Sequence, residues 1–224
     1  MSGINQPGGP FVACPHPSVS GRERELRHLS DGVRRLIRVV NSRDLSREDR
    51  ARAAARLTPI VEALEARVPE PVPSRLHLGD PVDVPHAGAP YDVIHGLYNP
   101  IAPPVTIRYD PPDAVGEVVF DATYEGPPGR VHGAVLIATF DMVFSSANVV
   151  AGVSGPTGSL KVQYDEATRT DVPAEFRARQ VGRTGRRLHL AGELRQEGVL
   201  TCRAEGVFIA LERDELHRLS VDDG

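Results

Sequence analysis

The stretch GPPGRVHGAVLIATFDMVF, residues 126–144, decides the fold of this chain. Its glycines and prolines predict a turn, and the apolar run that follows predicts one long buried helix, from residue 131 to about residue 150. Asp141 interrupts this run and is the only formally charged side chain in residues 131–160. An unpaired carboxylate is unfavourable in an apolar interior. Asp141 therefore reaches the solvated side of the helix, caps a helix, or is kept for chemistry.

Strand patterns flank this helix on both sides. Before it, Val105–Tyr109 is a short strand candidate, and segment 115–126 alternates with Val118, Phe120, Ala122 and Tyr124 on one face. After it, four more strand patterns follow in residues 157–167, 174–183, 186–198 and 199–213, with Tyr164 counted on the apolar face of the first. Turn residues at Gly182–Gly185 and Gln196–Gly198 predict an antiparallel meander.

These elements predict an α+β fold in which a curved antiparallel sheet wraps around the central helix. The helix is apolar on nearly all sides, so both of its faces require cover. A single sheet covers only one of them. A second subunit is the natural cover for the other.

The N-terminal part predicts a helical hairpin over residues 21–68. Apolar residues at helical spacing and arginines at positions 22, 24, 27, 34, 35 and 38 make the first helix amphipathic with a basic face. Such a face is usually solvated, although membrane surfaces and acidic partners also bind basic helices. Ser46 is the expected N-cap of the second helix, which Pro59 kinks or restarts with Thr58 as a new cap.

The chain therefore divides into five expected regions. These are a flexible tail (1–20), the helical hairpin (21–68), a linker or arm with six prolines (69–90), the α+β domain (91–212) and a C-terminal tail (213–224).

Bulk composition narrows the functional classes. A formal net charge of −4 over 224 residues gives no electrostatic reason to expect a nucleic-acid partner. The two cysteines, Cys14 and Cys202, are too few for a disulfide framework and lack metal-ligand spacing. We expect no signal peptide, no membrane span, no metal site and a cytoplasmic location.

One constellation resembles a known family. His132, Gly133 and Ala134 open the helix, Asp141 follows about two turns later, and Thr157 begins the next strand. This order is similar to that of the PaaI-like acyl-CoA thioesterases of the hotdog fold, where His-Gly-Gly, an acid and a Thr or Ser stand in these places. The resemblance covers roughly residues 91–212 and implies hydrolysis of an acyl-CoA thioester to a free acid and coenzyme A. It implies no cofactor beyond the coenzyme A of the substrate.

The resemblance also implies roles for these residues. The backbone N–H groups at Gly133 would form the oxyanion hole, and Asp141 would be a general base or a nucleophile. Thr157 would orient the water or the carboxylate, while His132 shapes the turn more readily than it acts as a base. Ala134 replaces the second glycine; it still supplies a backbone N–H, but its methyl group narrows the space beside the bound carbonyl.

Spacing adds a geometric expectation. Gly133 and Asp141 are eight residues apart, about 12 Å along a helix, which is too far for both to reach one carbonyl carbon. If both act, they come from different chains, so we expect an obligate homodimer, or a dimer of dimers, with sites at the interface.

Three arginines and two rival functions complete the expectations. Arg183, Arg186 and Arg187 crowd one turn, where they either hold the phosphates of coenzyme A or are simply solvated. A catalytically silent hotdog protein that binds acyl-CoA or an acyl carrier is the first rival, favoured by Ala134 and the N-terminal extension. Another hotdog enzyme, a hydratase or dehydratase, is the second, and the chain lacks its histidine motif.

Overall fold

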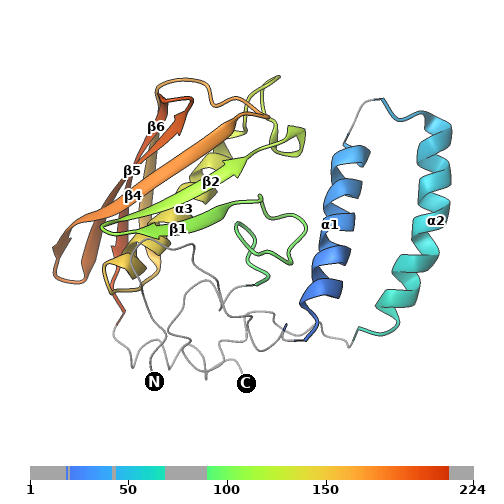
Figure 1. The fold of residues 1–224 in the computed structure, drawn as a ribbon, viewed down its shortest axis with the longest axis horizontal. Coiled ribbons are helices and arrows are strands. Elements are labelled where there is room, and N and C mark those ends of the chain that lie inside the picture. The colour runs from blue at the N-terminus through green and yellow to red at the C-terminus, as the bar shows by residue number, and fades with distance from the viewer. Residues whose placement is uncertain (1–18, 20, 42–43, 69–89, 212–224) are drawn as a thin grey trace.

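Six antiparallel strands form one curved sheet in the order β1-β2-β4-β5-β6-β3 (Figure 1). The strands are β1 (Thr106–Asp110), β2 (Asp113–Val119), β3 (Thr157–Tyr164), β4 (Pro173–Thr184), β5 (Arg187–Gln196) and β6 (Val199–Ile209). The computed structural model describes residues 19, 21–41, 44–68 and 90–211. The expected C-terminal tail, all but one residue each of the expected N-terminal tail and linker, and Cys14 lie outside these residues.

The predicted meander is correct for β4, β5 and β6 and wrong for β3. Both predicted turns join neighbouring strands, β4 to β5 and β5 to β6. β3 instead pairs with β6 at the edge of the sheet. The chain after β3 crosses the end of the sheet, where the N–H groups of Asp165 and Glu166 both donate to the carbonyl of Thr201.

The alternating segment before the helix is also shorter than its pattern predicts. β2 ends at Val119, and Ala122–Tyr124 form a short 3-10 helix. The carboxylate of Asp121 accepts a hydrogen bond from the N–H of Thr123, and this local bond competes with strand pairing.

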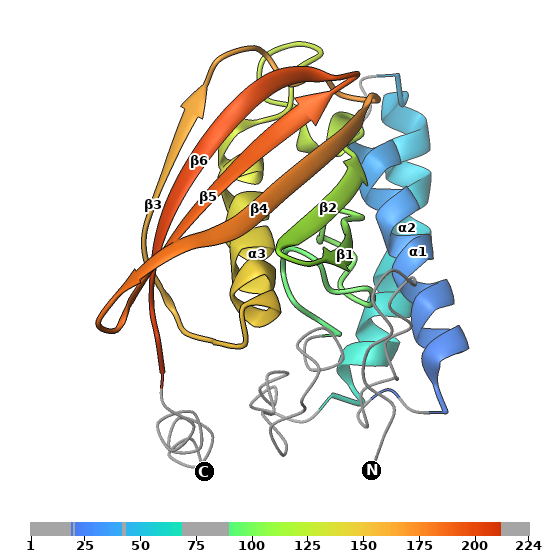
Figure 2. The ribbon, with the colours of Figure 1, turned by 60° about the vertical axis from the view of Figure 1, so that its left-hand side comes forward.

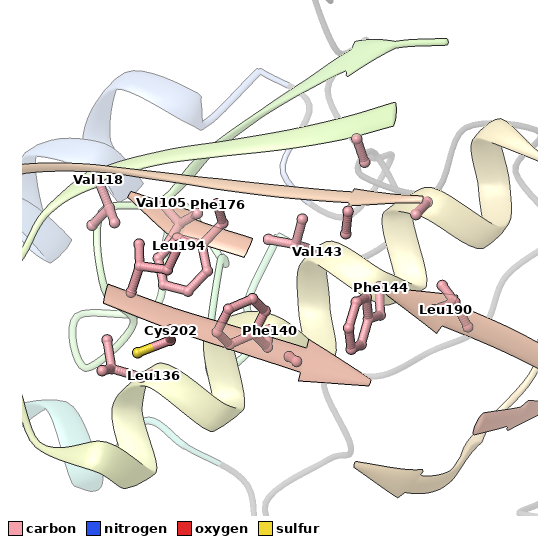
Figure 3. Close-up of a cluster of buried hydrophobic side chains, with 14 of the residues drawn as sticks. Val105, Val118, Leu136, Phe140, Val143, Phe144, Phe176, Leu190, Leu194 and Cys202 are labelled. Carbon is pink, nitrogen blue, oxygen red and sulfur yellow. The ribbon is translucent and has the colours of Figure 1, made fainter. Parts of the chain in front are cut away.

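The central helix α3 (Gly133–Val150) lies across the concave face of the sheet, which curves around it (Figure 2). Phe140 and Phe144 are fully buried beneath it, and the ring of Phe140 meets that of Phe176 edge-on at 4.9 Å (Figure 3). Two glycines make room for Phe144: a Cβ at Gly192 or Gly206 would lie 2.9 or 2.8 Å from its ring. The predicted α+β hotdog architecture, with the sheet wrapped around a long helix, is confirmed.

Phe144→Ala is expected to reduce the free energy of unfolding by about 3–5 kcal/mol, because it empties the space that these glycines leave. Denaturant titration followed by circular dichroism measures the change. Val181→Ala is the matched control, since Val181 is 59% exposed, and we expect it to have little effect. A cost below about 1 kcal/mol for Phe144→Ala would mean that the core does not depend on this contact.

The residues that the structure describes leave one side of α3 uncovered. By length and hydropathy this helix could cross a membrane, against the expectation that no apolar run is long enough, but its large apolar side chains form the core. Along this side His132, Ala134 and Ile137 are exposed, and Asp141 is half-buried at its margin. Asp141 is therefore not in a dry interior, and its place in the third turn excludes a capping role.

The N-terminal extension consists of two helices, α1 (Glu23–Val40) and α2 (Arg47–Glu65), as predicted. Ser46 caps α2 by accepting from the N–H of Asp49. Pro59 does not restart the helix, which runs through it, and Thr58 donates to the carbonyl of Ala54 instead of capping a new helix. All described residues of α2 are exposed, so the proline ring disturbs no packed neighbour.

Candidate functional site

The N-terminus of α3 is fixed by a short closed loop. Glu125 and Val131 pair across the loop, and the N–H of His132 donates to the carbonyl of Tyr124 at 2.9 Å. The His132 ring then turns back over the helix, where its Nδ1 accepts from the N–H of Ala134 at 3.1 Å. His132 is thus the N-cap of α3. Its hydrogen bond to the backbone is of the kind expected from the sequence.

This cap leaves one free donor at the start of the helix. The N–H groups of Val135 and Leu136 donate to the carbonyl of His132, at 3.0 and 3.3 Å, and that of Ala134 is taken by the His132 ring. Among the described residues, no acceptor takes the N–H of Gly133. The positive end of the helix dipole lies at the same place. An oxygen atom that gains negative charge is therefore stabilised best at Gly133.

Tyr164 also belongs to this part of the site, a role that the sequence did not predict. It ends β3, and its hydroxyl donates to the carbonyl of Gly133 at 3.1 Å. A Cβ at Gly133 would lie 2.9 Å from the hydroxyl oxygen of Tyr164, so glycine keeps space that a larger residue would fill. The phenol of Tyr164 is protonated at neutral pH and able to donate, and burial raises its pKa still further. A hydroxyl on an otherwise apolar strand face was the signal available in the sequence.

Asp141 and Thr157 form the second part of the site. The hydroxyl of Thr157, at the start of β3, donates to Oδ1 of Asp141 at 2.6 Å. This bond to a charged acceptor fixes the rotamer of the carboxylate. A half-buried carboxylate held in this way is suited to accept a proton from water or to attack an electrophilic carbon.

Two half-sites therefore lie along the seam between α3 and the edge strand β3. One holds Gly133 with Tyr164 and the other Asp141 with Thr157, at opposite ends of β3. Eight residues of continuous α-helix separate Gly133 from Asp141, or about 12 Å. A single chain does not bring the two half-sites to one carbonyl carbon.

The three arginines predicted to hold phosphate occupy the β4–β5 turn. Nε of Arg183 donates to the carbonyl of Gly185, and Nε of Arg186 to that of Ala210. Leu188, Phe208 and Thr157 share a row across β5, β6 and β3, so the turn lies at the Asp141 end of the sheet. At the other end of the sheet, Leu194 of β5 shares a row with Tyr164, whose hydroxyl contacts Gly133. Arg187 is seven residues from Leu194 along β5, so the β4–β5 turn is about 24 Å from the level of Gly133.

Comparisons with known proteins include a match over almost the whole chain. No family model matches the sequence, and a search of curated proteins finds no match. The crystal structure of protein RHA08564, a thioesterase superfamily protein, is similar at 28% identity and a TM-score of 0.73, covering 92% of this chain and 98% of that one.

Two shorter proteins match about half of the chain. One is a mutant of the phenylacetic acid degradation protein PaaI from Thermus thermophilus, with 24% identity and a TM-score of 0.45 over 48% of this chain and 93% of that one. The other is a hypothetical thioesterase protein with coenzyme A from Streptococcus pneumoniae, with 16% identity and a TM-score of 0.42 over 44% and 80%.

Proposed function

Because this chain has the hotdog fold of the thioesterase superfamily, we propose that it hydrolyses an acyl-CoA thioester to a free acid and coenzyme A. The predicted resemblance to hotdog thioesterases is confirmed at the level of fold and superfamily. The observation that carries the proposal is the pair of half-sites on α3: a free N–H at Gly133 and a carboxylate held by Thr157.

In the proposed reaction, the thioester carbonyl oxygen accepts the N–H of Gly133 at the positive end of α3. Water attacks the carbonyl carbon as Asp141 takes its proton, and negative charge moves onto the carbonyl oxygen. The carbonyl reforms as the carbon–sulfur bond breaks, and the coenzyme A thiolate leaves and is protonated. Direct attack by Asp141 would give an acyl anhydride that water then hydrolyses, and both routes require the same residues.

The active unit of this proposal is a homodimer. Two α3 helices packed antiparallel through their uncovered sides would bring Asp141 of each chain beside Gly133 of the other. Ile137 is 40% exposed on that side, so the same contact would bury apolar surface. A dimer of dimers would contain the same pairs of sites.

The proposal is tested by measuring thiol release from acyl-CoA substrates of increasing chain length, with aromatic acyl groups included. We expect turnover of at least one substrate by the full chain without added metal or redox cofactor. A protein that binds acyl-CoA in calorimetry but hydrolyses none of the panel would be a silent binding protein. Ala134 favours that second function, since its N–H is already bonded to His132 and its side chain is exposed beside Gly133.

A further inference from the structure

A cavity of about 310 Å³ separates α1 from the chain that leads into α3. Arg34, Arg35 and Arg38 line it from α1, and Pro100, Pro104 and Tyr124 line it from the facing segment. Its size is at the lower end of the range for small-molecule sites. None of the half-site residues lines this cavity.

The wall that α1 provides is fixed in place. Ser30 is buried and its hydroxyl donates to the carbonyl of Tyr98 at 2.9 Å. Arg34 donates to the carbonyls of Leu97 and Asn99 and forms an ion pair with Asp31 at 2.9 Å. Arg34 is therefore occupied in docking α1 onto the domain.

Arg35 and Arg38 take no part in these docking contacts. Both are exposed at the cavity, and among the described residues neither has a hydrogen-bond or ion-pair partner. The cavity contains two carboxylates, Asp31, which is paired with Arg34, and Asp121, whose Oδ1 accepts from the N–H of Thr123. Three arginines against two aspartates leave a positive excess, so the cavity favours an anion. Guanidinium groups suit phosphate in particular.

Pro100, Pro104 and Tyr124 form most of the opposite wall, with Asp121 and Thr123 beside them. Pro100 and Pro104 contribute apolar side chains. The Tyr124 ring is held in place, because it meets Phe120 edge-on at 5.9 Å and its hydroxyl donates to the carbonyl of Ala102. Apolar side chains beside a basic edge suit a ligand that has both an aromatic base and phosphates. An acidic protein surface would meet the basic helix but would leave the concave wall unfilled.

This cavity adjoins the candidate active site. Tyr124 lines it, and the carbonyl of the same residue accepts the N–H of His132, directly before Gly133. We propose that the cavity binds the adenosine 3′,5′-bisphosphate end of coenzyme A, with Arg35 and Arg38 on its phosphates. The thioester would then reach Gly133 past the wall that contains Tyr124. This inference rests on the proposed thioesterase function.

The test separates nucleotide binding from turnover. Calorimetry with adenosine 3′,5′-bisphosphate should show binding to the full chain, weakened about tenfold or more by the double variant Arg35→Gln, Arg38→Gln. The same variant should raise KM about tenfold for an acyl-CoA, leave its kcat unchanged, and leave the matching acyl-pantetheine unaffected. Both side chains are exposed, and equal thermal unfolding midpoints would confirm that the variant is folded.

Two charge-matched variants are the controls. Arg24→Gln, Arg56→Gln removes two exposed arginines of the hairpin that do not line the cavity, and it should bind the nucleotide as the wild type does. If Arg183→Gln, Arg187→Gln weakens binding and the α1 variant does not, the phosphates lie at the β4–β5 turn and this inference is wrong. It is also wrong if the variant Arg35→Gln, Arg38→Gln hydrolyses an acyl-CoA as the wild type does and loses activity only toward a thioester on an acyl carrier protein. Nucleotide binding without any hydrolysis would overturn the proposed function and leave this site standing.

Discussion

Asp141→Asn is expected to lower kcat for acyl-CoA hydrolysis by about 10²–10⁴-fold, because the amide can neither take a proton from water nor attack the carbonyl. The substitution keeps the size of the side chain, and the amide oxygen can still accept the hydroxyl of Thr157. Thiol release under saturating substrate measures the effect. KM should change little, since the carboxylate acts on the reacting carbon and not on the bound nucleotide.

Thr157→Val is the matched variant for the same half-site. It removes the 2.6 Å hydrogen bond but keeps the carboxylate, so we expect a smaller loss, roughly tenfold. Equal circular dichroism spectra and unfolding midpoints establish that both variants are folded. A folded Asp141→Asn protein that keeps full activity would remove Asp141 from the mechanism, whatever the effect at Thr157.

A heterodimer of two inactive variants is expected to recover about half of the wild-type activity if the half-sites act across chains. One chain carries Asp141→Ala and the other Gly133→Val, which places a side chain against the hydroxyl of Tyr164. Each homodimer lacks one half of both sites. In the heterodimer one site has lost both groups, and the other combines an intact Gly133 with an intact Asp141.

Co-expression with two different affinity tags and purification on both gives this heterodimer. The control pairs Asp141→Ala with the double variant Gly133→Val, Asp141→Ala, which has no intact site and should stay inactive. Recovery only in the first pair supports action across chains. If the first pair is as inactive as the control, or if no heterodimer survives purification, the two-chain site is wrong.

The fold was predictable from the sequence because its periodicities are long and unmixed. The apolar run after residue 130 exceeds the length of a strand, and the turn residues at Gly185 and Gly198 give the connections of β4 to β6. The position of β3 was not predictable in the same way. Its pairing with β6 depends on a loop that crosses the end of the sheet and is held by backbone bonds to Thr201, and such bonds carry no side-chain signature.

The site was predictable to the extent that its groups lie on one helix. Helical rise alone places Gly133 and Asp141 about 12 Å apart, and Thr157 meets the carboxylate as expected. Tyr164 could not be placed, because its contact joins residues 31 positions apart. The cavity beside α1 could not be predicted for a similar reason. Arg34 donates to carbonyls 63 and 65 positions away, whereas the sequence shows only that α1 has a basic face.

The glycines beneath Phe144 have a consequence beyond packing. The missing side chains at Gly192 and Gly206 set the height of α3 above the sheet, since any Cβ there would push on the ring. A dense core passes such a displacement on to the whole helix. Gly133 and Asp141 would shift together against the edge strand that holds Tyr164 and Thr157. Gly192 and Gly206, which belong to neither half-site, therefore set how closely Gly133 and Asp141 approach β3.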